Sequence, residues 1–517
     1  MHDPSLPLVY LVGAGPGDPG LVTLRAVECL QRADVVLHDK LVSPRVLDLA
    51  PANSLRICVD QLPGEHPQRW PYIHQVMLEH ARTGRVVVRL KGGDPFIFGR
   101  GGEEAEVLRA AGIPFEVVPG VTAALAASAY SEIPLTHRAC ASAVALITGH
   151  ENPTKPEISL DWKALAQFPG TLAIYMGIAR LELIVQVLLQ HGKPSDTPAA
   201  VVQLASTGHQ QTRTTTLAKL ADVVRDEGLM APAIILIGPV VGLRPEKSWF
   251  ERRPIFGQRV LVTRPQHQAG EMLRRLEELG AIPYLLPAVE VHDPKDWRPV
   301  DEAISRLHDF SWLVFTSSNG VQKFFVRLLG LGHDLRNLAG VKIAVIGPGT
   351  ADALRRFHLQ PDLVPETFHS EALAAMLCER AAGQRILLVR ADRGRDVLRQ
   401  ELSKTCEVEQ VAVYSQADAV EPDSRILRSL SRGEIRYITF TSSNIARATL
   451  RHLDDICRLR IRQGTVKIVT ISPVTSAAVR EFGMDVAAEA REYTVEGLLK
   501  ALVELHQASG SHATSTS

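Results

Sequence analysis

The chain has 517 residues, of which 45% are hydrophobic and 22% charged; this composition excludes a disordered protein and predicts several domains. Its 57 basic and 57 acidic residues cancel, so no overall charge attracts a nucleic acid or an anionic membrane. The six cysteines form no CxxC pair and no metal-binding spacing, which predicts reduced thiols and no metal site. Because no charged leader and no apolar run of about 18 residues is present, we expect a cytoplasmic protein without a membrane partner.

The first predicted element is a buried strand, Leu8–Val12, which enters the glycine-rich loop Gly13–Gly20. Helical spacing of apolar residues predicts a helix over Leu21–Ala33, and Asp34–Asp39 is the next predicted strand. The loop matches the GxGxxG fingerprint and the second strand ends in an acid, so NAD binding is a competing hypothesis. Pro19 argues against it, because a phosphate-binding helix would donate an amide there and proline has none.

A second glycine-rich stretch follows the predicted strand Arg85–Leu90. It holds five glycines within the eleven residues Gly92–Gly102, together with Asp94 and two phenylalanines. Glycine permits positive φ and lets a ligand approach the backbone closely. A strand that ends in such a loop is typical of ligand sites in α/β folds, and an ordinary turn is the alternative.

Further strands alternate with helical stretches up to residue 240. This alternation predicts α/β layers with largely parallel pairing, in two subdomains that divide near Pro119. Pro119–Leu125 resembles a second ligand loop entering a helix of small residues, for which tight helix packing is the alternative. The predicted strands are Phe115–Val118, Ser142–Thr148, Thr171–Met176, Ala199–Leu204 and Ala233–Ile237.

The second half of the chain repeats itself. Phe315–Asn319 recurs 125 residues later as Phe440–Asn444, and Lys342–Thr350 recurs at the same offset as Lys467–Thr475. A repeat of domain length predicts two similar α/β lobes. Hydroxyl-rich loops at the strand ends of both lobes could bind an anionic ligand or serve as helix N-caps.

The domain boundaries follow from these patterns. We predict a first domain over residues 1–250, a linker over 251–256, a two-lobed domain over 257–505 and a disordered tail over 506–517. The region around the linker breaks all periodicity, with some packing expected through Trp249 and Phe250.

The first half resembles uroporphyrinogen-III C-methyltransferase of the tetrapyrrole methylase family. The resemblance implies two methyl transfers from S-adenosylmethionine to uroporphyrinogen III, giving precorrin-2, and a homodimer through this half. The segments that carry it are Val12–Asp18, Val36–Ser43, Lys91–Glu104, Val118–Ala123, Ile133–Arg138 and Tyr175–Gly177.

Site residues in this half are implied by the same resemblance. Asp39 is the implied general base, since methylation of a pyrrole carbon must be followed by proton loss; an aspartate that caps a turn is the alternative. Gln61 stands where family members carry a lysine assigned as proton donor, and Arg56, His66, Arg69 or His74 are candidates to replace its charge. The implied cofactor residues are Pro16, Gly92, Gly93, Asp94, Ile97, Thr122, Ala123, Met176 and Ala205.

The second half resembles uroporphyrinogen-III synthase, through Val262–Pro265, Phe315–Gly320, Val345–Thr350, Val413–Tyr414, Phe440–Asn444 and Ser472–Ser476. The resemblance implies closure of hydroxymethylbilane with inversion of ring D, without a cofactor, by two α/β lobes joined by a two-stranded hinge. Tyr414 is implied to assist hydroxyl loss, and a strand aromatic near the hinge is the alternative. The implied carboxylate-binding residues are Arg264, Ser317, Ser318, Thr350, Ser442, Ser443 and Thr475.

The two resemblances support each other, because the product of the synthase is the substrate of the methylase. The sequence therefore predicts a bifunctional enzyme acting on small tetrapyrroles, towards sirohaem or cobalamin. Two alternatives remain open: a synthase with a silent, regulatory methylase-like module, and a methylase that acts on another substrate.

Overall fold

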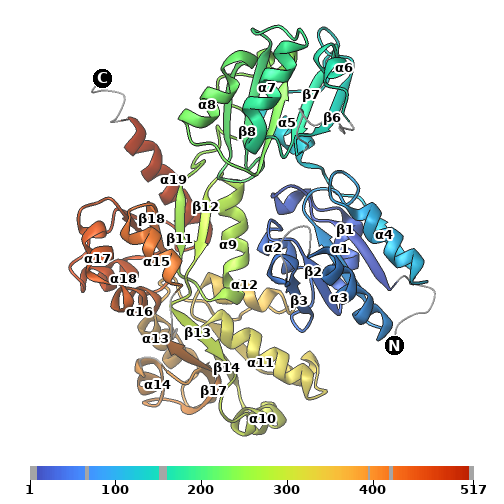
Figure 1. The fold of residues 1–517 in the computed structure, drawn as a ribbon. Helices are drawn as coiled ribbons and strands as arrows, with labels where there is room; N and C mark the ends of the chain where they lie inside the picture. Colours follow the sequence, from blue (N-terminus) through green and yellow to red (C-terminus); the bar gives the residue numbers. More distant parts are fainter. Residues whose placement is uncertain (1–7, 64–68, 151–159, 394–395, 419–422, 512–517) are drawn as a thin grey trace. The chain divides into compact units, whose positions relative to one another are not determined.

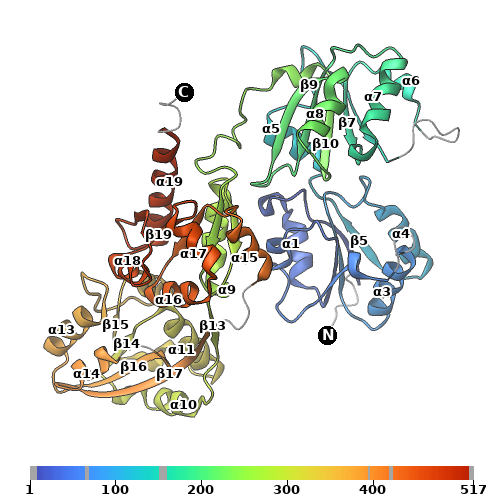
Figure 2. The ribbon, with the colours of Figure 1, turned by 60° about the vertical axis from the view of Figure 1, so that its left-hand side comes forward.

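The computed structural model describes residues 8–63, 69–150, 160–393, 396–418 and 423–511. The chain forms two compact units, one of residues 1–257 with 277–282 and one of residues 258–276 with 283–517. Each unit contains two five-stranded sheets, which can be followed in Figures 1 and 2. Within the described residues, none of the helices combines the length and apolar composition that a membrane crossing requires.

The first sheet is parallel throughout, in the order β3-β2-β4-β1-β5. Helices α1 and α2 cover one face, and α3 and α4 cover the other. The strands are β1 (Val9–Gly13), β2 (Val35–His38), β3 (Leu55–Cys58), β4 (Val87–Lys91) and β5 (Phe115–Val118), and the helices are α1 (Leu24–Gln31), α2 (Pro44–Leu47), α3 (Trp70–Arg82) and α4 (Gly101–Ala110).

This topology contradicts the NAD hypothesis. Dinucleotide-binding sheets have the order 3-2-1-4-5, whereas here β4 lies between β2 and β1. In addition, α1 begins at Leu24 with Thr23 as its N-cap, beyond a short 3₁₀ turn at Pro19–Leu21. The glycine loop therefore does not lead directly into the helix N-terminus that a pyrophosphate would need.

The second sheet has the order β6-β7-β10-β8-β9, and only β6 and β7 pair in parallel. Our expectation of largely parallel pairing is wrong here, because the seven residues between β8 and β9 can join only antiparallel neighbours. The strands are β6 (Val144–Thr148), β7 (Thr171–Tyr175), β8 (Pro198–Gln203), β9 (Gln211–Thr216) and β10 (Ala233–Ile237), and the helices are α5 (Ala123–Ser131), α6 (Trp162–Ala166), α7 (Leu181–Gln190) and α8 (Leu220–Asp226).

In the second unit, the first lobe has the sheet order β12-β11-β18-β19-β20. Helices α15 to α18 pack on one face of its core. The strands are β11 (Arg259–Val262), β12 (Ile282–Leu285), β18 (Tyr437–Phe440), β19 (Lys467–Thr470) and β20 (Ala488–Glu489), and the helices are α9 (Gln266–Glu278), α15 (Ser424–Ser431), α16 (Ser443–His452), α17 (Asp455–Arg462), α18 (Pro473–Arg480) and α19 (Val495–Ser511).

The second lobe has the order β13-β17-β16-β14-β15, in which β16-β14-β15 repeats the β11-β18-β19 core of the first lobe. The predicted internal repeat is therefore a repeat of architecture. β13 pairs antiparallel with the end of β17, and these two strands form the hinge. The strands are β13 (Val289–His292), β14 (Trp312–Phe315), β15 (Lys342–Val345), β16 (Arg385–Ala391) and β17 (Glu407–Asp418), and the helices are α10 (Arg298–Ser305), α11 (Ser318–Gly330), α12 (Pro348–Arg355), α13 (Ser370–Arg380) and α14 (Val397–Leu402).

The C-terminal tail differs from the prediction. Helix α19 continues to Ser511, so residues 506–511 are helical rather than disordered, and residues 512–517 lie outside the described chain. The helix is held on the sheet by a hydrogen bond between the Tyr437 hydroxyl and His506 Nδ1, 2.9 Å, and by one from Lys467 Nζ to Ser509 Oγ, 2.7 Å.

Candidate active sites

Three loops meet at the carboxyl edge of the first sheet, because β1, β4 and β5 are parallel neighbours. Gly15 and Gly93 exchange backbone hydrogen bonds of 3.2 and 2.8 Å, which join the first glycine loop to the second. A Cβ atom on Gly120 would lie 2.2 Å from the carbonyl oxygen of Gly93, so only glycine allows the third loop to approach. The sequence thus assembles one backbone-lined site from three segments, of which the first and last are about 105 residues apart.

The predicted cofactor residues of these loops differ in what they offer. Pro16 is half-buried, and Gly92 faces open space, since a Cβ there would meet no atom within 4 Å. Gly93 has φ +69°, which favours glycine. Asp94 uses both carboxylate oxygens on backbone amides: Oδ1 accepts from Phe96 and Ile97, and Oδ2 accepts from Gly120 at 3.0 Å. Asp94 therefore fixes the shape of the loop.

The second subdomain closes the same site. The Thr122 hydroxyl lies 2.8 Å from the hydroxyl of Tyr175, which also accepts a hydrogen bond from the amide of Ala124, next to Ala123. Met176 follows directly, with its side chain 49% exposed. Ala205 lies in the loop after β8, packed against the core that holds Ala123.

Non-glycine residues with positive φ are concentrated in and near these loops. Seven non-glycine residues in the described chain have positive φ, and five of them stand in the segments that carry the candidate cofactor residues: Phe98, Arg100, Met176, Leu204 and Ser206. Such conformations are unfavourable for L-residues and are commonly retained at ligand sites.

Asp39 is held by a buried network of charged side chains. Its Oδ1 lies 2.6 Å from Arg89 Nη2, and its Oδ2 accepts a hydrogen bond of 3.1 Å from the amide of Gly92. Arg89 Nε in turn lies 2.8 Å from Glu104, whose second oxygen is 2.9 Å from Lys91 Nζ. The side chains of Arg89, Lys91 and Glu104 are at most 1% exposed, whereas that of Asp39 is 30% exposed.

The network sets the ionisation of Asp39. Burial favours the neutral acid, but attraction by Arg89 and Lys91 and the hydrogen bonds from Arg89 and Gly92 outweigh it, so the pKa of Asp39 lies below its usual value. The result is a fixed anion at the edge of the site. It can stabilise a neighbouring positive charge and accept a strongly acidic proton.

Gln61 is exposed at the end of a 3₁₀ turn, Val59–Gln61. Arg69 contacts the residues on either side of Gln61. The Nε atom of Arg69 donates to the carbonyl oxygen of Leu62 at 3.0 Å, and its Nη1 lies 3.5 Å from Asp60. Arg56 pairs with Asp48 at 3.1 Å, and burial lowers the pKa of His74, which disfavours its charged form. His66 lies outside the described residues.

In the second unit, four predicted residues gather at the carboxyl edge of the second lobe. Ser317 caps α11, and its hydroxyl lies 2.9 Å from that of Tyr414, which is 4% exposed. Ser318 donates to the carbonyl oxygen of Gly349, beside the buried Thr350. Burial raises the pKa of Tyr414, so its hydroxyl keeps its proton at neutral pH.

The remaining four lie at the carboxyl ends of the strands of the first lobe. Ser442 caps α16, Ser443 opens that helix, and Thr475 lies 3.1 Å from the cap of α18, Ser472. Arg264 follows β11; its Nε is buried without a hydrogen-bond partner in the described chain, and burial lowers its pKa. Gln268 and Asn319 hydrogen bond across the two lobes, between the first turns of α9 and α11.

Sequence reasoning missed Arg89, Lys91 and Glu104 as site residues. A signal for two of them was present, because Arg89 and Lys91 alternate with apolar residues on a strand that the pattern marks as buried. Charges on the buried centre of a parallel sheet must be paired, and an acidic residue in the following helix was the available partner.

Comparison with known proteins gives a match for each half. A family model described as Tetrapyrrole (Corrin/Porphyrin) Methylases matches residues 8–221, and one described as Uroporphyrinogen-III synthase HemD matches residues 270–500. The porphyrin biosynthesis protein HemD of Ruminiclostridium josui is 35% identical over 499 residues, 96% of this chain and 98% of that protein. The uroporphyrinogen-III C-methyltransferase of Bacillus subtilis is 36% identical over 365 residues, 70% of this chain and 74% of that protein.

Other relatives match about half of the chain. The chain spans about half of the length of the siroheme synthase of Nitrosococcus oceani, 53%, with 49% identity over 250 residues. Among solved structures, the native uroporphyrin-III C-methyltransferase of Thermus thermophilus is 42% identical, covering 46% of this chain and 93% of that one, with a TM-score of 0.38.

Proposed function

The chain belongs to the tetrapyrrole methylase family through its first half and to the uroporphyrinogen-III synthase family through its second, and from that premise we propose that it is bifunctional. The second half closes hydroxymethylbilane to uroporphyrinogen III, and the first half methylates this product twice to precorrin-2. The observation that carries the proposal is the presence, in one chain, of two families that act on consecutive tetrapyrroles. The proposal includes a cytoplasmic enzyme that is a homodimer through the methylase half.

The residues at the three loop ends fit a folded adenosyl sulfonium. Gly92 leaves open space, the loops offer backbone amides and carbonyls at close range, and the exposed apolar side chains of Ile97 and Met176 suit an adenine ring. The residues that would hold the group are Pro16, Gly92, Gly93, Ile97, Thr122, Ala123, Met176 and Ala205, on a loop shaped by Asp94. When bound, S-adenosylmethionine supplies a methyl group on an electrophilic sulfonium.

Asp39 supports the transfer in two ways. A pyrrole carbon that accepts a methyl group leaves positive charge on the tetrapyrrole, and the anion fixed by Arg89 and Gly92 stabilises that charge. The cation must then lose a proton. Because a proton on a cationic ring is strongly acidic, a carboxylate with a lowered pKa is a sufficient base.

Arg69 takes over the charge that the lysine at position 61 would provide. It contacts Asp60 and Leu62 on either side of Gln61, and its side chain is 24% exposed. A guanidinium there can pair with a substrate carboxylate, which Gln61 can only hydrogen bond.

The synthase half acts mainly by shaping a flexible substrate rich in carboxylates. Arg264, whose buried Nε has no hydrogen-bond partner in the described chain, is the proposed cationic partner of a substrate carboxylate. Tyr414, kept protonated by burial and aligned by Ser317, can donate to the departing hydroxyl. The hydroxyls of Ser318, Thr350, Ser442, Ser443 and Thr475 are the further carboxylate contacts of the proposal.

The test is anaerobic turnover of the purified chain on enzymatically generated hydroxymethylbilane, with and without S-adenosylmethionine. Uroporphyrinogen III without the cofactor and precorrin-2 with it are the expected products. Uroporphyrinogen III under both conditions would instead favour the regulatory alternative, which the exposed, non-titrating Gln61 makes a specific candidate.

A further inference from the structure

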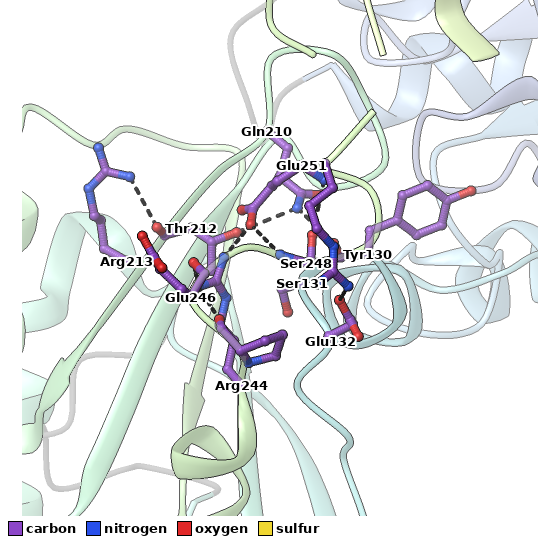
Figure 3. A network of polar contacts seen from close by, with 12 residues as sticks. Tyr130, Ser131, Glu132, Gln210, Thr212, Arg213, Arg244, Glu246, Ser248 and Glu251 are labelled. Atoms are coloured by element: carbon purple, nitrogen blue, oxygen red, sulfur yellow. Dashed lines mark hydrogen bonds and ion pairs between the residues drawn. The ribbon is translucent and has the colours of Figure 1, made fainter. Parts of the chain in front are cut away.

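The segment between the two halves, residues 243–257, packs on the first unit. Figure 3 shows the carboxylate of Glu251 in contact with both Arg244 and Ser248, and the amide of Ser248 donates to Glu251 at 2.8 Å. The Trp249 indole donates to the carbonyl oxygen of Ala129 at 2.9 Å, and its amide donates to Glu132. The segment is therefore fixed against the end of α5.

Two aromatic residues of this segment hold Tyr130. The ring centroid of Tyr130 lies 5.1 Å from that of Trp249 and 4.8 Å from that of Phe250. Tyr130 is 7% exposed and Phe250 is 2% exposed. Arg253 stacks on the other two rings at 5.1 and 4.5 Å. Such a packed, T-shaped and tilted cluster leaves Tyr130 few alternative rotamers.

Tyr130 also belongs to a closed hydrogen-bond network. Its hydroxyl donates to Asp18 Oδ2 at 2.7 Å, and the amide of Asp18 donates to Ser206 Oγ at 3.2 Å. The amide of Ser206 donates to Gln210 Oε1 at 3.0 Å, and Gln210 Nε2 returns to the carbonyl oxygen of Tyr130 at 3.0 Å. Burial and the hydrogen bond to Asp18 raise the pKa of Tyr130, so it stays a donor.

This hydrogen-bond network connects two loops of the candidate methylase site. Pro16 is two residues before Asp18, and Ala205 directly precedes Ser206, which has the strained φ of +67°. The loops also touch directly, since a Cβ on Gly17 would lie 2.8 Å from Thr207 Cγ2. A shift of Tyr130 must therefore move both loops.

We propose that Tyr130 is a positioning residue for these two loops, and that Trp249 and Phe250 clamp it, so the segment between the halves sets the affinity of the first half for its adenosyl cofactor. The inference rests on the proposed function. It makes the interdomain segment part of the methylase site rather than a passive tether.

The test uses the full chain with Tyr130→Phe, Trp249→Ala and the matched control Tyr72→Phe, whose side chain is exposed on α3. Binding of S-adenosylhomocysteine is measured by calorimetry, and amide hydrogen exchange of residues 15–20 and 204–210 is measured without ligand. Tyr130→Phe and Trp249→Ala should each weaken binding about tenfold and speed exchange in both loops, because a hydrogen bond to a charged group is lost or loosened. Tyr72→Phe should change neither.

Unchanged binding and exchange in Tyr130→Phe would overturn the inference. A wild-type chain that binds no S-adenosylhomocysteine would overturn the proposed function instead. The exchange data would still test whether the hydrogen-bond network of Tyr130 holds the two loops. Synthase turnover of each variant reports whether the second unit is folded, and the denaturant unfolding midpoint of the first unit reports whether that unit is folded. A cycle with Asp18→Asn adds a second check: the two substitutions should be far from additive if the Tyr130–Asp18 bond carries the effect.

Discussion

The carboxylate of Asp39, which directly follows β2, lies 2.6 Å from the guanidinium of Arg89 on the neighbouring strand β4. The pair places a fixed negative charge beside Gly92, and Glu104 and Lys91 complete a set of two anions and two cations. Because three of the four side chains are buried, the two positive and two negative charges of the set must balance.

Charge balance can be tested by removing the charges singly and together. Glu104→Gln leaves two buried cations against one anion and should destabilise the first unit by about 3–5 kcal/mol. Glu104→Gln with Lys91→Met restores balance and should recover most of that loss. Denaturant unfolding measures both, and Glu103→Gln, whose side chain is 50% exposed, is the control expected to stay within about 0.5 kcal/mol. Equal losses in the single and double variants would contradict the argument.

The pH dependence of methyl transfer should report Asp39. Arg89 and Lys91 lower its pKa, so the carboxylate of the wild type stays ionised throughout the neutral and mildly acidic range, and the rate should show no acid limb from Asp39 there. Arg89→Gln removes one cation, and the pKa must rise. The acid limb of the rate should then move to higher pH, measured as initial methyl transfer rates between pH 5 and 8. An unshifted limb would mean that Asp39 does not titrate in the reaction.

The second glycine loop contains a matched pair of positions. Gly93 has φ +69° and would place a Cβ 3.7 Å from the amide of Ala123, whereas a Cβ on Gly92 meets open space. Gly93→Arg should abolish S-adenosylhomocysteine binding and methyl transfer but leave cyclisation of hydroxymethylbilane unchanged. Gly92→Ala should retain measurable binding. Normal methyl transfer by Gly93→Arg would refute the assignment of this loop.

The sequence predicts these loops well, because several glycines after a strand permit the positive φ and the close backbone approach that such loops require. It predicts the repeat equally well, since Phe315–Asn319 and Phe440–Asn444 occupy matching strand ends. It fails where a contact joins residues far apart in the chain: nothing local pairs Tyr130 with Asp18. The polar strand Gln211–Thr216, which pairs with β8, also escaped notice, because its threonines favour a strand but it lacks the apolar residues by which the other strands were recognised.

The role of Arg69 can be separated from that of Gln61. If Arg69 supplies the missing positive charge, Arg69→Gln should raise the KM for uroporphyrinogen III about tenfold with little change in kcat, because a carboxylate partner is lost. Adding Gln61→Lys should restore the KM. Steady-state methylation kinetics give both values, with Arg56→Gln as a nearby control that loses its pair to Asp48. If Gln61→Lys does not rescue the variant, the two positions do not share one function.

The substitution Tyr414→Phe tests the proposed proton donor of the synthase half. Its hydroxyl is buried, protonated and 2.9 Å from Ser317, so Tyr414→Phe keeps the ring and removes only the donor. Cyclisation should slow by about 100-fold or more, as expected for the loss of one proton donor, so that uroporphyrinogen I from uncatalysed closure becomes a larger share of the product. Tyr437→Phe is the matched control, because that hydroxyl bonds to His506 on α19, away from Ser317. A rate unchanged in Tyr414→Phe would leave shaping of the substrate by Arg264 and the hydroxyl loops as the source of catalysis.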